Sequence, residues 1–210
     1  MRLGLVTLVL TALMVAAACG NPATNKSQAL TGEAAQAPSV QPAGAQTYSI
    51  TPENSKIEFV GSKVTGSHNG AFEKFSGEVH YTGDVNTSHV AITMQTDSLT
   101  TDTPDLTKHL KTPDFFDVAK YPEAKFESTA IKPGGDKGAS HTITGNLTLH
   151  GATKSVTFPA TIAVAPDAIT VDSTFAIDRK DFGINYAGAA DNLIRDDVVL
   201  TLKIRATKPT

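Results

Sequence analysis

The 210-residue sequence contains one cysteine, Cys19, and no tryptophan. A single thiol cannot form an internal disulfide, so a disulfide framework does not hold the fold. The 18 basic residues are outnumbered by 21 acidic residues and form no cluster. Such a surface attracts neither nucleic acid nor anionic lipid by charge. Beyond residue 18, no apolar run is long enough to cross a bilayer as a helix.

The first residues have the pattern of an export signal. Arg2 supplies a positive charge, residues 3–15 are almost entirely apolar, and residues 16–18 are alanines. This pattern predicts a signal peptide over residues 1–18, too short to span a bilayer. Cys19 follows at once, as in a bacterial lipobox, although Ala16 replaces the commoner Leu or Val. We therefore expect lipid attachment at Cys19, with ordinary cleavage beside an incidental cysteine as the alternative.

The same segment predicts where the protein resides. A lipid on Cys19 would anchor the chain to a membrane in the bacterial cell envelope, with its folded part facing the periplasm or the exterior. Residues 19–46 are mostly small and polar, with Leu30 and Val40 their only large apolar side chains. This composition predicts a disordered linker, and residues 47–210 are predicted to form one folded domain. The sequence is compatible with a homodimer.

Alternation of apolar and polar residues dominates that domain. It is clearest along residues 156–164, 169–177 and 198–206, and weaker versions raise the number of strand-like segments to eight. Because helical periodicity is nearly absent, the sheet is expected to be antiparallel. The predicted fold class is therefore all-β. Eight strands with one apolar face either close into a barrel or divide into a sandwich.

One long interruption, between Thr100 and Glu123, contains two similar helix starts. Residues 103–105 and residues 112–114 both read Thr-Pro-Asp, which offers a threonine N-cap, a proline at the first helical position and an acidic first turn. One or two short helices near residues 103–118 are therefore expected, covering one end of the sheet.

The inward register indicates that the barrel can be hollow. Small residues fall at positions that should point inside: Gly61, Gly77, Thr96, Ser128, Gly145 and Ser173. Unfilled volume costs stability, so a solid core would carry larger side chains there. The alternative is that the glycines permit barrel bends and the hydroxyls are satisfied locally. Composition alone leaves both interpretations open.

Four stretches resemble the YceI-like family in the family's order, covering residues 48–206. They are residues 62–72 with 75–79, 109–118 with 120–126, 145–154, and 177–184. The resemblance implies a single eight-stranded, lipocalin-like β-barrel with a hydrophobic tunnel for a long-chain isoprenoid or similar lipid. The first stretch departs from the more familiar members, since residues 65–68 lack their basic-His pattern near the head-group end.

The candidate ligand-binding residues are mainly phenylalanines, each of which can also be ordinary core. The predicted wall consists of Phe59, Phe75, Phe126, Phe158 and Phe175. Phe115 and Phe116 are lid candidates on the interruption. The family-like stretches add Phe72, Phe182, His68 and His109. Lys63, Lys154, Arg179, Lys180 and Arg195 could pair with a phosphate head group or form exposed salt bridges.

Patterns for covalent chemistry are absent from the sequence. The six histidines have no metal-site spacing, and no G-x-S-x-G motif occurs. We therefore expect a lipid carrier or buffer that is not an enzyme, with no metal and no cofactor besides the bound lipid. Two alternatives stay open: an enzyme acting on such a lipid through His68 or His109 and a nearby carboxylate, and a solid barrel serving as an interaction module.

Overall fold

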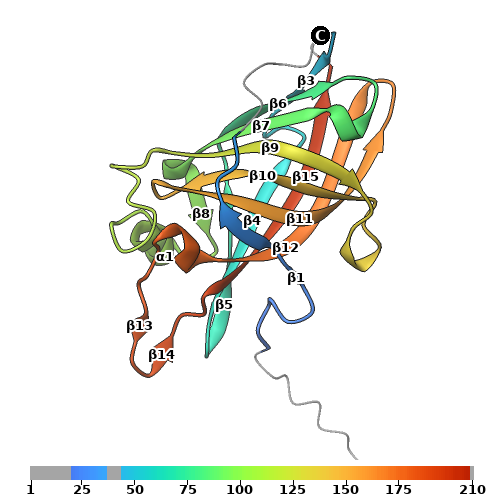
Figure 1. The fold of residues 1–210 in the computed structure, drawn as a ribbon. Coiled ribbons are helices and arrows are strands. Elements are labelled where there is room, and N and C mark those ends of the chain that lie inside the picture. Colours follow the sequence, from blue (N-terminus) through green and yellow to red (C-terminus); the bar gives the residue numbers. More distant parts are fainter. Residues whose placement is uncertain (1–19, 37–43, 209–210) are drawn as a thin grey trace, which may run out of the picture.

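The structure, a computed structural model, describes residues 20–36 and 44–208, and it is almost entirely β (Figure 1). Cys19, the expected signal peptide and part of the expected linker lie outside the described residues. The strands are β1 (Ser27–Gln28), β2 (Leu30–Glu33), β3 (Gln46–Ile50), β4 (Lys56–Lys63), β5 (Gly66–Phe72), β6 (Phe75–Tyr81), β7 (His89–Gln95), β8 (Leu99–Thr101), β9 (Glu123–Pro133), β10 (His141–Leu149), β11 (Ala152–Val164), β12 (Ala168–Asp178), β13 (Gly188–Ala189), β14 (Asn192–Leu193) and β15 (Asp197–Thr207). The helical elements are α1 (Pro104–Leu110) and the 3₁₀ turns η1 (Val85–Thr87), η2 (Thr96–Ser98), η3 (Asp136–Gly138) and η4 (Arg179–Phe182).

The main sheet closes into the expected eight-stranded antiparallel barrel. Neighbours run in the order β12, β11, β10, β9, β7, β6, β3 and β15, and β15 pairs back with β12. Three of the eight strands are interrupted: β3 continues as β4, β5 as β6, and β7 as β8, since each pair meets the same neighbouring strands. The barrel prediction is therefore confirmed.

Serine hydroxyls maintain hydrogen bonding where these strands break. Between β3 and β4, Ser55 Oγ accepts from the backbone N–H of Arg205 at 3.0 Å. Between β5 and β6, Ser98 Oγ accepts from the N–H of Lys74 at 3.0 Å. A buried backbone donor left without a partner is costly, so these side chains replace ladder bonds that the bends remove.

Only the first of the two expected helices forms. α1 begins at Pro104, as the sequence predicts, although the Thr103 side chain makes no capping hydrogen bond. Residues 112–117 instead form hydrogen-bonded turns, with Thr112 O accepting from the N–H groups of Phe115 and Asp117. Asp117 has a positive φ of 44°, outside the right-handed helical region, and this prevents the turns from continuing as a helix.

The N-terminal stretch expected to be disordered is partly structured. Within residues 27–33, hereafter the N-terminal strap, β1 pairs in parallel with β12 and β2 pairs antiparallel with β11. Figure 1 shows this blue segment lying against the barrel wall. The strap therefore replaces the direct pairing of β11 and β12, which is limited to residues 161–164 and 169–172. The disorder prediction is wrong for the strap, because main-chain pairing orders it without a large apolar surface.

A proline explains why β11 and β12 separate. Pro159 carbonyl oxygen accepts a 2.5 Å hydrogen bond from Ser173 Oγ of β12, so this edge of Pro159 faces β12. A residue in an antiparallel ladder offers its N–H and C=O to the same neighbour, and proline has no N–H to offer. The pairing of β11 with β12 therefore ends before Pro159. Beyond it, the strap lies between the two strands and pairs with both.

α1 and the β13–β14 hairpin lie at the same end of the barrel, at the lower left of Figure 1. Among the described residues, no helix is long and apolar enough to cross a membrane.

Candidate functional site

The barrel is hollow toward the end that carries α1 and the β13–β14 hairpin. A cavity of about 410 Å³ extends from the aromatic interior to a mouth formed by residues from β4, β5, α1 and the hairpin. This volume lies within the range of small-molecule sites. A second cavity, bounded by residues including Tyr81, Val85 and Ile169, has only about 20 Å³. The larger of these two cavities therefore lies toward the end that carries α1 and the hairpin.

Aromatic rings from several strands line the cavity. Phe158 of β11 stacks on Phe175 of β12, with ring centroids 4.2 Å apart and planes 8° apart. Phe126 of β9 packs against Phe158 at 5.7 Å. Nearer the mouth, Phe72 lies 5.9 Å from both Phe59 and Phe116. Such rings offer large apolar surfaces with few polar demands, which suits an apolar ligand.

Three rings form a cluster at the mouth. His109 of α1 lies 5.1 Å from Phe115 and 5.1 Å from Tyr186, and Phe115 lies 5.2 Å from Tyr186. His109 Nε2 is also 2.9 Å from Asp114 Oδ2. Tyr186 precedes the β13–β14 hairpin and is 38% exposed. The helix side and the hairpin side of the mouth are thus joined by ring contacts, and such contacts can separate.

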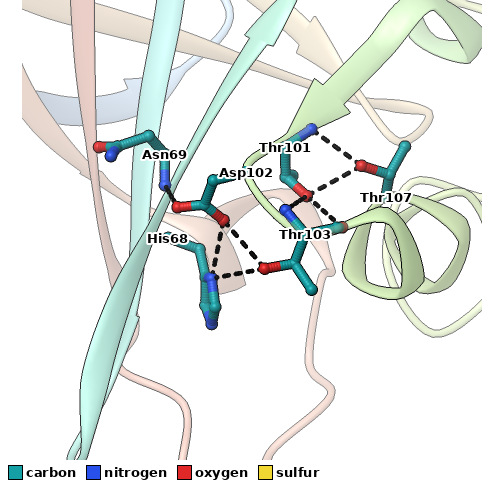
Figure 2. A network of polar contacts seen from close by, with 6 residues as sticks. All are labelled: His68, Asn69, Thr101, Asp102, Thr103 and Thr107. Atoms are coloured by element: carbon teal, nitrogen blue, oxygen red, sulfur yellow. Dashed lines mark hydrogen bonds and ion pairs between the residues drawn. The ribbon is translucent and has the colours of Figure 1, made fainter.

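A polar network fixes the other side of the mouth, where β5 meets the start of α1 (Figure 2). His68 Nδ1 lies 2.9 Å from Asp102 Oδ1, and Asn69 N–H donates to Asp102 Oδ2 at 3.0 Å. The Asn69 N–H first, and His68 second, hold the pKa of Asp102 below its ordinary value. Thr103 Oγ1 donates to the same carboxylate at 3.2 Å, and Thr101 N–H donates to Thr107 Oγ1 at 2.8 Å. Asp102 therefore serves as a fixed acceptor that anchors His68.

The small inward residues have different surroundings. A β-carbon on Gly61 would meet no atom within 4 Å, whereas one on Gly145 would fall 2.4 Å from the Phe126 ring. Ser128 Oγ accepts from Val90 N–H at 2.9 Å, and Thr96 Oγ1 donates to Tyr121 O at 2.6 Å. Ser173 is bonded to Pro159, as described above. The cavity therefore arises at Gly61 and among the large side chains, while the hydroxyls are satisfied locally.

Most of the candidate ligand-binding residues line the cavity. These are Phe59, Phe72, Phe115, Phe116, Phe126, Phe158, Phe175, His68 and His109. Phe75 and Phe182 do not. Phe75 begins β6 directly after the strand break and is buried in the core, and Phe182 lies fully buried in η4. Burial away from the cavity makes both of them core residues.

Sequence reasoning missed the hairpin side of the mouth. Tyr186, Gly188, Asn192 and Ile194 all line the cavity, yet residues 184–195 have no strand-like alternation. The available signal was turn chemistry. Gly188 adopts a φ of 85°, a conformation that favours glycine and that marks the hairpin.

The polar groups at the mouth were compared with the arrangements that catalysis or metal binding requires. His68 and His109 each contact a carboxylate, as an acid–base role would require. Within residues 20–36 and 44–208, however, no three His, Cys, Asp or Glu side chains come together as metal ligands would. The arrangement is an apolar container with a few polar groups at its opening.

Comparison with known proteins identifies the family. The model of the YceI-like domain matches residues 48–206. The chain belongs to the YceI-like family. A UPF0312 protein of Pseudomonas putida strain W619 is 37% identical over 136 residues, which cover 61% of this chain and 70% of that protein. A UPF0312 protein of Pseudomonas fluorescens strain SBW25 is 34% identical over 138 residues, covering 62% of this chain and 71% of that protein.

Solved YceI-like structures share the barrel. Burkholderia cenocepacia BcnA has 26% identity and a TM-score of 0.67, covering 75% of this chain and 99% of BcnA. A polyisoprenoid binding domain from Saccharophagus degradans has 16% identity and a TM-score of 0.62, covering 79% of this chain and 99% of that domain. At that identity the second likeness shows the fold alone. The YceI-like family is one of binding proteins, and the barrel of this chain fits a lipid-binding role.

Proposed function

We propose that this protein is an envelope lipid-binding protein that holds a long-chain isoprenoid or similar amphiphile in its barrel, as a carrier or buffer without covalent chemistry. The observation that carries the proposal is the cavity of about 410 Å³, lined mainly by apolar and aromatic side chains and open at one mouth. The Saccharophagus relative is described as polyisoprenoid binding, which supports the ligand class.

The energetics favour a long apolar tail. Burial of one CH₂ group contributes about 0.8 kcal/mol. Association costs roughly 4–15 kcal/mol in lost freedom and ordering. A tail of several isoprene units exceeds that cost, so affinity would come from the tail and selectivity from the polar groups at the mouth.

The envelope location is part of the proposal and rests on the N-terminal sequence. Lipid on Cys19 would stand eight residues before Ser27, where the strap begins (27 − 19). Eight residues span at most about 30 Å even when fully extended. The barrel would therefore lie close to the membrane and could exchange ligand with it.

Two measurements test the proposal. The protein purified from its native host is denatured, and its organic extract is analysed by mass spectrometry. The proposal expects a long-chain lipid at close to one molecule per chain, and extracts that repeatedly contain no lipid would contradict it. Affinities for farnesol, geranylgeraniol and a longer prenol should then rise with tail length until the cavity is filled.

The two histidine–aspartate pairs at the mouth favour a second candidate, acid–base chemistry on the same lipid. His68 with Asp102 and His109 with Asp114 are both at 2.9 Å. Incubation of the protein with the extracted lipid distinguishes the two functions. The carrier proposal expects the lipid to return unchanged in mass, whereas a modified lipid lost in His68→Gln or His109→Gln would favour the enzyme.

A further inference from the structure

The strap closes the barrel wall directly outside the cavity. Over residues 154–157 of β11 and 175–176 of β12, hereafter the β11–β12 seam, the two strands pair with the strap and not with each other. Val156 and Phe175 of the seam line the cavity. Behind the strap, the two strands are joined by the stacked rings of Phe158 and Phe175, a contact that can separate. The strap therefore provides the main-chain closure of this part of the wall.

The strap closes the wall without contributing to the cavity lining. Among the described residues that line the cavity, none belongs to residues 27–33. Within the strap only Ser27 and Ala29 are buried, and Leu30 is 73% exposed. A segment that buries so little apolar surface separates from a fold at a lower free energy than the fold itself unfolds. Departure of the strap would thus open the wall while the side chains that line the cavity stay in place.

Exposed polar contacts hold the chain where the strap ends. Asn146 Oδ1 accepts from the N–H of Ala35 at 3.0 Å, and Asn146 Nδ2 donates to Ala35 O at 2.6 Å. Lys154 Nζ lies 3.4 Å from Glu33 Oε1, and the Glu33 side chain is 95% exposed. Water competes for such exposed hydrogen bonds and ion pairs, so each one contributes little. This end of the strap can therefore leave the barrel without disturbing the core.

We propose that the strap is a gate: it leaves the β11–β12 seam, and a long apolar lipid tail passes sideways between β11 and β12 into the cavity. This inference rests on the proposed function, since the tail is that of the bound lipid. An opening at the end of a barrel admits a tail end-first, whereas the seam follows the strands and admits it along its length. The strap begins eight residues after Cys19 (27 − 19), so a lipid on Cys19 would keep the seam close to the membrane that holds the ligand.

A disulfide between the strap and β11 tests the gate. Leu30 stands directly opposite Thr157, and neither residue lines the cavity. Directly opposite residues on antiparallel strands are close enough for a disulfide, so Leu30→Cys, Thr157→Cys can fix the strap in place. The full chain is used with Cys19→Ser, because Cys19 is the only natural thiol. Stopped-flow fluorescence then measures the uptake and release of dansyl-labelled geranylgeraniol by the oxidised and the reduced protein.

The disulfide should change the rates of lipid exchange and leave the affinity unchanged. We expect oxidation to slow uptake at least about tenfold, because the tail must wait for an opening that the disulfide prevents. Release should slow by the same factor, since the strap is docked in both the empty and the loaded protein, and reduction should restore both rates. Asn146→Ala removes both bonds to Ala35 and should instead speed uptake about threefold or more.

A matched control places a disulfide in the wall away from the strap. Thr148 of β10 and Thr153 of β11 stand directly opposite each other, with their Oγ1 atoms 2.9 Å apart. Neither residue lines the cavity or pairs with the strap. Oxidation of Thr148→Cys, Thr153→Cys in the same Cys19→Ser chain should leave uptake and release unchanged. Mass spectrometry of the intact protein verifies that each disulfide has formed.

Three results would overturn the gate, and a fourth would contradict the function on which it rests. Equal uptake rates for the oxidised and reduced strap variant would assign entry to the mouth and leave the lipid-binding function intact. A weaker affinity at an unchanged uptake rate would make the strap a support of the binding site and not its entrance. Equal slowing by the control disulfide would trace the effect to a stiffer wall. Failure of the unmodified protein to bind the probe would contradict the lipid-binding function itself.

Discussion

Ser27 Oγ donates a 2.6 Å hydrogen bond to Asp136 Oδ2, which links the N-terminal strap to the turn between β9 and β10. This bond is the main reason that the pKa of Asp136 lies below its ordinary value. A carboxylate with a lowered pKa stabilises the fold above its ordinary pKa, and this contribution is lost as the pH falls through the lowered value.

Ser27→Ala should therefore raise the pKa of Asp136 toward its ordinary value. The same change should weaken the pH dependence of stability on the acidic side. Carboxyl NMR titration measures the pKa directly. Ser76→Ala, an exposed serine on β6, is the control and should leave Asp136 unchanged. An unaltered Asp136 titration in Ser27→Ala would show that the strap does not reach the turn in solution.

Ala29→Pro tests whether the strap is part of the barrel wall. Ala29 is buried, and its N–H donates to Ala176 O at 2.8 Å. Proline removes that donor and leaves the carbonyl of fully buried Ala176 unpaired, so unfolding should become easier by about 1–3 kcal/mol. Denaturant titration measures the loss, and hydrogen exchange should rise in β11 and β12. Ala34→Pro, at an exposed position beyond β2, should have little effect on either measurement.

Gly61→Leu and Gly145→Leu should behave in opposite ways. Space beside Gly61 is open, so leucine there should occupy the cavity and reduce lipid binding with little change in stability. Leucine at position 145 must displace the Phe126 ring and would meet Glu127 O, so it should cost roughly 1–3 kcal/mol of stability. Thermal unfolding and prenol binding together separate the two effects. Similar losses of stability in both variants would mean that the region beside Gly61 is already filled.

His89 should make the protein less stable in mild acid. Burial is the main factor that lowers the pKa of His89 below 6.5, and the charge of His80 lowers it further while Glu127 opposes the shift. The two imidazole rings stack at 6.0 Å, and His89 Nε2 lies 3.5 Å from Glu127 Oε1. Because the unfolded chain binds the proton more readily, stability decreases as the pH falls below 6.5 toward the lowered pKa.

The measurement for His89 is chemical denaturation at about pH 7.5 and about pH 5.5. His89→Gln should lose part of the difference between the two conditions. His141→Gln, at the partly exposed first position of β10, provides the matched substitution. An identical pH dependence in the unmodified protein and in His89→Gln would disprove the assignment.

Tyr186→Ala should speed the release of ligand. The Tyr186 ring contacts both His109 and Phe115 across the mouth, and one aromatic pair contributes about 0.5–1.5 kcal/mol. Loss of these contacts should raise the dissociation rate about tenfold, because 1.4 kcal/mol corresponds to a factor of ten. Stopped-flow release of a fluorescent prenol measures the rate. Leu193→Ala, on the exposed side of the same hairpin, should release ligand at the unmodified rate.

Alternation of apolar and polar residues was sufficient to predict eight strands with one dry face, and the resemblance to the YceI-like family decided for a barrel over a sandwich. The register of β12 and β15 places Val171, Phe175 and Ile177 on one face, as the sequence indicates. Such a pattern reports directly on which side of a strand is dry, so strand number and the phenylalanine lining followed from it. The start of α1 followed from Pro104 and Asp105, although the expected side-chain cap from Thr103 does not form. The second expected helix is prevented by the conformation of Asp117, which the sequence pattern does not report.

Composition failed to predict the strap, because main-chain hydrogen bonds and not apolar side chains hold it against the barrel. Leu30 is 73% exposed in the strap, while Ser27 and Ala29 are buried, the reverse of what side-chain hydropathy predicts. Main-chain pairing with β11 and β12 is nearly independent of side-chain identity, so a small, polar segment can form a strand. The gap between β11 and β12 that the strap fills depends on Pro159. The effect of Pro159 can be predicted only when β12 is known to be the strand beside it.

The split between β11 and β12 also constrains the order of assembly. The strap is made early in the chain but pairs with residues 154–157 and 175–176, which are made late. Contacts between such distant segments require a large loop to close, and this slows folding. The barrel can complete its last seam only after nearly all of the chain has been made, so a newly synthesised molecule passes through a state in which the edges of β11 and β12 are unpaired.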